Sequence, residues 1–198
     1  VIKESKIVGH NGLILGTDLS NKSLNVLKKR IFTKNIKLKN IDLDKTSNYL
    51  AKKKFKFDKI ISSYALYYAK NPIKVIQDCS KFLKPNGYFL ITAPCYPHTL
   101  IEFADKHRIL SKEVKKQIDF SSQKLEKFLL KKKIKNKVFR FKNILKFKNK
   151  EDLLIFYRST VFYNKKKEKN LLKFFDINFR KKKYLNIIKS ANLYKFTL

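Results

Sequence analysis

Residues 57–68 read FDKIISSYALYY, and residues 71–92 continue NPIKVIQDCSKFLKPNGYFLIT. Residues 59–63, centred on Ile60 and Ile61, are predicted as a buried strand, and residues 88–92 form an apolar run typical of a second strand. Between them, Pro72 suits the first turn of a helix whose apolar residues recur at helical spacing. A strand, a crossover helix and a second strand make a βαβ unit with parallel strands. This stretch therefore predicts an α/β fold.

The same alternation extends upstream. Residues 13–17 and 36–41 have the pattern of strands, and Ser20 can cap a helix between them. In a parallel α/β sheet, ligands bind beyond the carboxyl ends of the strands. The candidate site therefore consists of the residues that directly follow the strands: Asp18, Asp42, residues 62–68 and residues 93–98.

The second half of the chain has a different pattern. Residues 98–133 are helical in pattern and very basic, and they predict a helical insertion after the strand at 88–92. Further patterns predict strands at residues 138–147 and 191–197, and helices at residues 151–160 and 166–176. Together the two halves predict a Rossmann-like, doubly wound, mostly parallel sheet with helices on both faces.

The composition fits one soluble domain. A chain of 198 residues with 43% hydrophobic content can build one sizeable core. No apolar run approaches the roughly 18 residues of a membrane span, and no signal peptide opens the chain. Cys79, Cys95 and three scattered histidines form no metal-ligand cluster. We therefore expect a cytoplasmic protein without membrane contact, without a metal and with two buried thiols.

The net charge of +33 comes from 48 basic residues against 15 acidic ones. Most of the cations are lysines, whereas proteins that read nucleic acids usually rely on arginine. Four triple-lysine runs are interpreted as solvated surface: residues 52–54, 131–133, 165–167 and 181–183. The charge predicts non-specific attraction of polyanions, with a dedicated nucleic-acid function as the alternative.

Two acidic motifs follow the upstream strands: LGTDLS at residues 15–20 and NIDLD at residues 40–44. Asp18 lies at the tip of a strand, where a carboxylate can accept hydrogen bonds from both hydroxyls of a ribose. The alternative is a helix N-cap formed by Asp18 or Ser20. Asp42 can accept a hydrogen bond from an exocyclic adenine amine, and the alternative there is a polar turn.

In their order and spacing, the motifs LGTDLS, NIDLD, FDKIISSYALYY and FLKPNGYFLIT resemble class I S-adenosylmethionine-dependent methyltransferases of the type 11 group. That family shows IGxDxS at its second strand, a GDA turn, FDxVxSxxxLxH at its fourth strand and LKPGG before its fifth. The likeness covers residues 7–95, and residues 147–160 resemble the C-terminal part of some members. Asn86 replaces the first glycine of LKPGG, which asparagine can do because it tolerates a left-handed backbone.

The resemblance implies that S-adenosylmethionine is the cofactor and gives a role to four residues around its adenosine. Asp18 would hold the ribose, with Leu19 packing beside it. Asp42 would contact the adenine amine, with Leu43 against the ring.

The resemblance also implies roles near the reacting methyl group. Ser62 and Ser63 would lie beside the methionine portion and the transferred methyl group. Apart from the resemblance, the aromatic residues Tyr64, Tyr67, Tyr68 and Tyr96 could form a wall that favours the cationic sulfonium, with core packing as the alternative. Tyr68, or its neighbour Tyr67, takes the place of a family histidine near the acceptor. His98 follows the fifth strand of the family and is the candidate general base, with a surface or packing role as the alternative.

The glycine-rich loop of the family is absent. That loop lies about 20 positions before the acidic residue, which places it at or before Val1. The pair Gly9 and Gly12 directly precedes a strand and is interpreted as a turn between a helix and that strand. Because the chain also contains no methionine, we expect a fragment that lacks the first strand and the glycine loop.

These observations predict one methyltransferase domain over residues 1–198, with a cofactor-binding core at 1–97 and an acceptor-side lid and C-terminal strands at 98–198. Methyl transfer from a sulfonium is an in-line displacement, so the protein mainly aligns the acceptor with the methyl group. The favoured acceptor is a small molecule, held by residues 94–134 and 157–163. The alternatives are an RNA or ribosome-associated methyltransferase and an inactive nucleic-acid-binding remnant of the fold.

Overall fold

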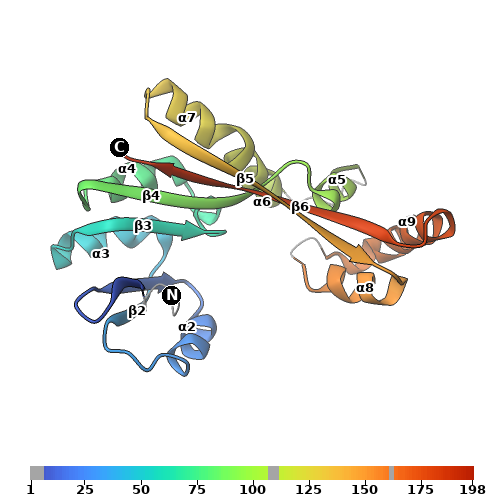
Figure 1. The fold of residues 1–198 in the computed structure, drawn as a ribbon, viewed down its shortest axis with the longest axis horizontal. Coiled ribbons are helices and arrows are strands. Elements are labelled where there is room, and N and C mark those ends of the chain that lie inside the picture. The colour runs from blue at the N-terminus through green and yellow to red at the C-terminus, as the bar shows by residue number, and fades with distance from the viewer. Residues whose placement is uncertain (1–6, 107–111, 161–162) are drawn as a thin grey trace. The chain divides into compact units, whose positions relative to one another are not determined.

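The computed structural model describes residues 7–106, 112–160 and 163–198. The chain forms two compact units, whose elements are labelled in Figure 1. The first unit comprises the residues up to Phe57 together with residues 68–84, and the second comprises residues 58–67 and 85–198. The predicted cofactor residues are therefore divided: Asp18 and Asp42 belong to the first unit, and Ser62, Ser63 and Tyr64 to the second.

The first unit contains a two-stranded parallel sheet of β1 (Ile14–Asp18) and β2 (Ile36–Asn40). Helix α2 (Asn21–Lys28) connects the strands, as predicted. Its N-cap is Ser20, whose Oγ accepts a hydrogen bond from the Ser23 amide at 3.1 Å. The cap satisfies one of the amides that a helix leaves free at its first turn.

A helix that the sequence does not predict follows β2. The 3₁₀ turn η1 (Leu43–Lys45) leads into α3 (Thr46–Lys53), which ends at Lys54 in a left-handed conformation. Leu50 is the one residue of α3 that is buried. A helix with a single buried side chain carries too little apolar periodicity to be recognised from its sequence.

Gly9 and Gly12 form the turn before β1, as predicted. The Gly12 amide donates to the Gly9 carbonyl at 3.4 Å, and Asn35 Nδ2 donates to the same carbonyl at 2.7 Å. Gly9 has a φ of 73°, which favours glycine, and a Cβ atom on Gly12 would overlap Val8. Both glycines are therefore accounted for by the local backbone.

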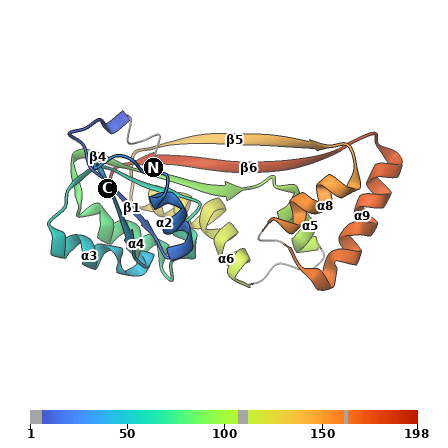
Figure 2. The same ribbon diagram turned by 90° about the horizontal axis from the view of Figure 1, so that it is seen from below.

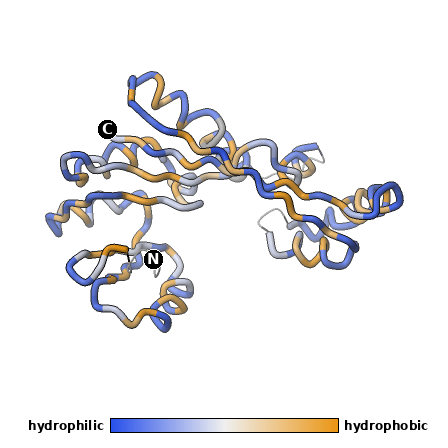
Figure 3. The backbone as a smooth tube through the Cα atoms, viewed as in Figure 1, coloured by the Kyte–Doolittle hydropathy of each residue, from blue (hydrophilic) through white to orange (hydrophobic). Residues whose placement is uncertain are grey.

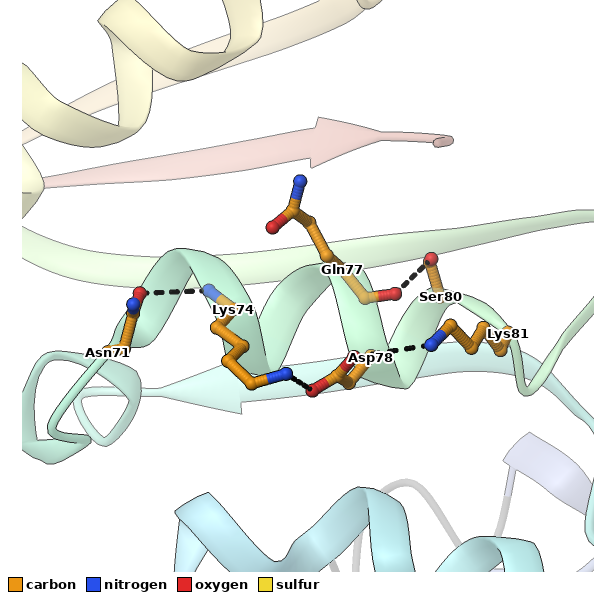
Figure 4. A network of polar contacts seen from close by, with 6 residues as sticks. All are labelled: Asn71, Lys74, Gln77, Asp78, Ser80 and Lys81. Carbon is orange, nitrogen blue, oxygen red and sulfur yellow. Dashed lines mark hydrogen bonds and ion pairs between the residues drawn. The ribbon is translucent and has the colours of Figure 1, made fainter.

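Helix α4 (Pro72–Ser80) begins where the sequence predicts (Figure 4). Asn71 is its N-cap and accepts a hydrogen bond from the Lys74 amide at 3.0 Å, and Pro72 occupies the first turn. On the exposed side, Asp78 pairs with Lys74 at 2.8 Å and with Lys81 at 3.3 Å. The hydrogen bond from Lys74 holds the pKa of Asp78 below its ordinary value.

Replacing Asn71 by alanine is expected to lower the free energy of unfolding by about 1 kcal/mol, because the first turn of α4 loses its side-chain acceptor. Asn71→Asp keeps an acceptor at the same place and should leave stability nearly unchanged. Urea unfolding followed by circular dichroism measures both variants. An equal loss in the two variants would mean that the cap does not stabilise the helix.

The second unit is built on a four-stranded sheet in the order β3–β4–β6–β5. Strands β3 (Phe57–Ser63) and β4 (Leu83–Cys95) run in the same direction (Figure 1). Strand β6 (Leu185–Phe196) is antiparallel both to β4 and to β5 (Asn136–Phe147). Parallel pairing therefore joins β1 to β2 and β3 to β4, and the C-terminal strands add an antiparallel half.

Strand β4 is longer than the predicted strand at 88–92. It begins at Leu83, before the predicted start at residue 88, and Asn86 within it has the expected left-handed backbone with a φ of 65°. It also continues past the predicted end at Thr92 to Cys95, which lies opposite Ser190. The extension at this end depends on β6, a partner that is about 100 residues distant in sequence and absent from the local pattern.

The predicted helical insertion between β4 and β5 is confirmed. It contains α5 (Thr99–Lys106), α6 (Lys112–Asp119), a π-helical turn η3 (Phe120–Lys124) and α7 (Leu125–Lys131), and residues 107–111 lie outside the described part. Helix α7 buries Leu125 and Leu129 and connects to β6 through a hydrogen bond from the Tyr194 hydroxyl to Glu126 at 3.0 Å. A role of this insertion as a lid stays a prediction.

At the far end of β5 and β6, helices α5, α8 (Lys150–Arg158) and α9 (Glu168–Lys181) lie close together (Figure 2) and share a buried apolar cluster. The 3₁₀ turn η4 (Lys165–Lys167) leads into α9. The buried cluster consists of Leu100, Phe103, Leu153, Tyr157, Leu171, Phe175, Leu185 and Ile187. Hydrophilic and hydrophobic segments alternate along these helices (Figure 3), as expected for helices that bury one face.

Cys79 and Cys95 are both buried and free, as predicted. Burial raises the pKa of the Cys79 thiol to about 11. Cys95 Sγ lies 3.2 Å from the Asn192 side-chain oxygen, to which it donates a hydrogen bond. Both thiols are therefore protonated at neutral pH and unsuited to nucleophilic chemistry.

Within the described ranges, no helix is both long and apolar enough to cross a membrane. In the same part of the chain, no group of three or more histidine, cysteine, aspartate or glutamate side chains is placed to hold a metal ion.

Candidate functional site

The carboxyl ends of β1 and β2 bring the two predicted acidic residues of the first unit to one edge of their sheet. The parallel register places Asp18 opposite Asn40, and the Ile41 amide donates to the Asp18 carbonyl at 3.2 Å. Asp42 follows one residue later. The sequence therefore predicts correctly that both carboxylates lie at the same edge of this sheet, because parallel strands end together.

Asp18 uses one of its carboxylate oxygens to form a local turn. Its Oδ1 accepts a hydrogen bond from the Ser20 amide at 2.8 Å, and the side chain is exposed. Its other oxygen has no hydrogen-bond partner among the described residues. Both roles considered for this motif are therefore present. Ser20 caps the helix, and Asp18 keeps one carboxylate oxygen that can accept a hydrogen bond from a ligand.

Asn40 holds the backbone beside Asp18 in place, a role that the sequence analysis did not assign. Its Nδ2 donates to the carbonyls of Asp18 at 3.0 Å and of Leu19 at 2.7 Å. The residue was visible in the NIDLD motif, but its bond partners become known only once the register of β1 and β2 is known. Asn40 therefore fixes the turn that presents the Asp18 carboxylate.

The structure distinguishes the two carboxylates of the NIDLD motif. Both oxygens of Asp44 accept a hydrogen bond from the Lys70 amide, at 3.1 and 3.2 Å, so the Asp44 carboxylate binds the backbone at Lys70. Asp42 caps η1 and accepts the Asp44 amide at 3.0 Å through Oδ1 alone. Its second oxygen has no described partner. Asp42 is accordingly the residue of this pair that can accept from a ligand.

The two leucines that follow these aspartates differ in exposure. Leu19 is 69% exposed, and Leu43 is half-buried. An exposed leucine beside a hydrogen-bonding carboxylate is suited to pack against a flat ligand. The roles of Leu19 and Leu43 stay predictions.

In the second unit, the residues after β3 form a tight, hydrogen-bonded turn. Ser62 Oγ accepts from the Leu66 amide at 3.1 Å, and the Tyr64 amide donates to the Thr92 carbonyl of β4 at 2.9 Å. Tyr64 has a left-handed backbone with a φ of 51° and a half-exposed ring. Such strain in a bulky residue is typical of functional turns.

Tyr64 also lines a cavity of about 190 Å³ in the second unit. The other residues around it come from the end of β4, from β5 and from β6: Pro94, His98, Phe141, Asn143, Lys189, Ser190 and Ala191. Tyr64, His98 and the segment 93–98 were predicted from the sequence to lie at the site. The residues of β5 and β6 were not predicted, because nothing in their local sequence indicates which strand they pair with.

Ser190 is the buried polar residue of this cavity that most clearly indicates a ligand. It is 5% exposed, and its Oγ is enclosed without a hydrogen-bond partner among the described residues. A buried hydroxyl without a partner costs free energy, which a bound polar group can recover. The cavity is thus suited to a small molecule that carries a polar group.

His98 is buried against this cavity, at 4% exposed. Burial, and secondly the charge of Lys189, lower its pKa from 6.5 to about 4. The imidazole is therefore neutral at physiological pH and a weak base. It is suited to orient an acceptor through a hydrogen bond rather than to remove a tightly held proton.

The free energy of unfolding is expected to fall by about 3 kcal/mol as the pH drops from 6.5 to 4, because the unfolded chain binds a proton on His98 that the folded chain does not. This contribution is complete above pH 6.5, the ordinary pKa of histidine, and is lost progressively down to the lowered pKa of His98. Urea unfolding at several pH values measures it. A His98→Gln variant should show a shallower pH dependence, and identical slopes would contradict the assignment.

Tyr68, the second predicted catalytic residue, lies in the first unit at the end of η2 (Leu66–Tyr68) and is 58% exposed. Its role stays a prediction. Of the segments expected to hold the acceptor, residues 107–111 and 161–162 lie outside the described part of the chain.

Comparison with known families matches residues 2–192 to a methyltransferase domain. The chain belongs to this methyltransferase family. The match spans nearly the whole chain, and it confirms the predicted class, a methyltransferase with S-adenosylmethionine as the methyl donor. A search of curated protein sequences gives no significant match to this methyltransferase.

Several solved structures are similar to the methyltransferase in fold. Protein BH2331 of Bacillus halodurans C-125 has a TM-score of 0.61 and 14% identity, over 92% of this chain and 81% of its own. The plantazolicin methyltransferase BpumL, solved with a pentazolic desmethylPZN analogue and SAH, has a TM-score of 0.52 and 15% identity, over 98% and 71%. YcgJ of Bacillus subtilis has a TM-score of 0.51 and 11% identity, over 93% and 82%. At such low identities the likeness confirms the Rossmann-like α/β fold alone.

Proposed function

We propose that Asp18 and Asp42 hold the adenosine moiety of S-adenosylmethionine, and that a small methyl acceptor binds in the cavity lined by Tyr64, His98 and Ser190. The two aspartates fit the cofactor because each keeps one oxygen without a described partner, at the carboxyl ends of adjacent parallel strands. The oxygen of Asp18 suits the ribose hydroxyls, and that of Asp42 suits the adenine amine. Leu19 and Leu43 would supply apolar contact beside them.

Ser62, Ser63 and Tyr64 are proposed to lie beside the methionine portion and the methyl group, as the family resemblance implies. S-adenosylmethionine supplies a methyl group that is already activated by its sulfonium. The residues of the chain therefore need only bind the acceptor, orient it and exclude water. The Ser190 hydroxyl would form a hydrogen bond with the methyl acceptor, as donor or as acceptor of the proton. Neutral His98 would accept a hydrogen bond from a hydroxyl or amine group of the methyl acceptor.

The size of the cavity supports a small acceptor. At about 190 Å³ it is smaller than the roughly 300–1,000 Å³ that pockets for drug-sized ligands occupy. The single observation that carries this proposal is the buried Ser190 Oγ without a partner in a cavity that also holds His98. We further propose that both units act as one methyltransferase domain, which the family match across residues 2–192 supports.

Methyl transfer from tritiated S-adenosylmethionine tests the proposed acceptor class. The chain would be incubated with a panel of small phenols, amines, thiols and carboxylic acids, and separately with total RNA. Transfer to at least one small compound is expected. Transfer to RNA alone would overturn the small-molecule proposal.

A Ser190→Leu variant, which fills the cavity, is expected to lose about 100-fold in transfer to that compound while it keeps its affinity for S-adenosylhomocysteine. Ser190→Ala leaves the cavity open and should lose less. Equal activity in Ser190→Leu and the parent chain would show that the acceptor binds elsewhere.

A further inference from the structure

A second concave surface lies at the far end of the β5–β6 pair. Helix α8 begins and helix α9 ends at this end of the two strands (Figure 2). It is a cleft of about 410 Å³ that opens broadly to solvent. Its lining consists of Lys148, Asn149, Lys150, Asp176, Phe179, Arg180, Lys182 and Lys183. None of these residues lines the cavity proposed for the acceptor.

The cleft concentrates positive charge from two segments that lie about 30 residues apart in sequence. Lysines alternate through the end of β5 into α8, and Arg180 to Lys183 follow in an unbroken cationic run at the end of α9. Asp176 is the one carboxylate in the lining, and it already pairs with Lys150 at 2.7 Å. The tertiary structure therefore joins two basic segments around one open surface.

Four cations of the cleft have no carboxylate partner among the described residues: Lys148, Arg180, Lys182 and Lys183. Like charges held this close repel one another, and bound anions relieve that repulsion. Glu151 and Asp152 already complement the N-terminal dipole of α8, so the attraction comes from the side-chain cations. The cleft is accordingly suited to a ligand with several negative charges.

Aromatic side chains accompany these cations. Phe179 lines the cleft and is partly buried against the neighbouring apolar cluster. Tyr184 follows Lys183 just outside the lining and is 40% exposed, with Lys146 Nζ 4.1 Å from its ring centroid. Cationic grooves with exposed aromatic rings bind single-stranded nucleic acids, since the cations follow the phosphates and the rings stack with bases. The broad opening favours an extended polymer over a small enclosed anion.

We propose that this cleft binds the phosphate backbone of a single-stranded nucleic acid. Arg180 can contact a phosphate with two parallel hydrogen bonds, and Lys148, Lys182 and Lys183 supply point charges along the chain. The site extends beyond the methyl-transfer function and does not depend on the acceptor. This proposal also differs from non-specific attraction by a uniformly basic surface, because the binding is localised to one end of the second unit.

Fluorescence anisotropy with a labelled 12-residue oligouridylate tests the proposal. The cleft variant replaces Arg180, Lys182 and Lys183 by glutamine. The matched control replaces Lys131, Lys132 and Lys133 at the end of α7, also by glutamine. Both variants therefore lose three positive charges within the same unit. Circular dichroism and S-adenosylhomocysteine affinity verify that both variants are folded.

The cleft variant is expected to lose about tenfold or more in affinity at physiological salt, and its log–log salt slope should fall by about 2, from the loss of three phosphate contacts. The control should change by much less. Equal losses in the two variants would overturn the proposal, since they would show attraction by net charge alone. Binding of the cleft variant to phosphatidylserine vesicles is measured as well. If this variant loses its affinity for the vesicles but keeps its affinity for the oligouridylate, the cleft binds a membrane surface and the proposal is overturned.

Discussion

Replacing Asp18 by asparagine is expected to weaken S-adenosylhomocysteine binding by about 10- to 100-fold. Asparagine keeps an oxygen that can accept from the Ser20 amide, so the turn after β1 stays intact. It replaces the second carboxylate oxygen by an amide donor, however, and removes the negative charge. A ribose hydroxyl would then lose its acceptor. Calorimetric titration with S-adenosylhomocysteine measures the effect.

Asp78→Asn is the matched control for this prediction. It removes the same charge from the same unit, but Asp78 lies on α4, where it is partly exposed and pairs with Lys74 and Lys81. Its affinity for S-adenosylhomocysteine should equal that of the parent chain. If Asp18→Asn also binds as tightly as the parent chain, Asp18 does not hold the cofactor. If both variants lose affinity equally, the effect is one of overall charge.

Replacing Phe175 by alanine is expected to lower the free energy of unfolding by about 3–5 kcal/mol. Phe175 on α9 is fully buried in the cluster that α5, α8 and β6 share. Removing its ring leaves a cavity that these neighbouring side chains can fill only in part. Urea unfolding, fitted with a common dependence on denaturant, measures the loss.

Ile177→Ala provides the comparison on the same helix. Ile177 is 55% exposed, and its truncation should cost about 0.5 kcal/mol or less, because little buried contact is lost. A loss in Phe175→Ala as small as that in Ile177→Ala would mean that this core is not formed in solution. The difference between the two variants separates burial from helix propensity, which changes similarly in both.

The candidate site could be predicted where it depends on local order along the chain. Asp18 and Asp42 each follow a strand, and parallel strands place their carboxyl ends together, so the sequence alone predicts their common edge. Ser20, Pro72 and Asn86 were predicted for the same reason, since helix starts and left-handed turns depend on a few adjacent residues.

The remaining parts of the site could not be predicted. Ser190 and Lys189 reach the cavity because β6 pairs between β4 and β5, and Asn143 reaches it from β5. Strand pairing over such distances depends on the whole sheet and leaves no local pattern. Asn40 and Asp44 were visible as polar residues, but only the register revealed which amides and carbonyls they bind.

The methyltransferase family, the α/β alternation and the acidic residues after the first strands could be predicted from the sequence, because periodicity, caps and motifs are local properties. Which distant residues share a cavity or a cleft depends on the tertiary structure. It paired β6 with β4 beside His98, and it joined the basic end of β5 to the basic end of α9. Such contacts arise because all helices and strands must bury their apolar faces against one another at the same time. The sequence of a single segment therefore does not predict them.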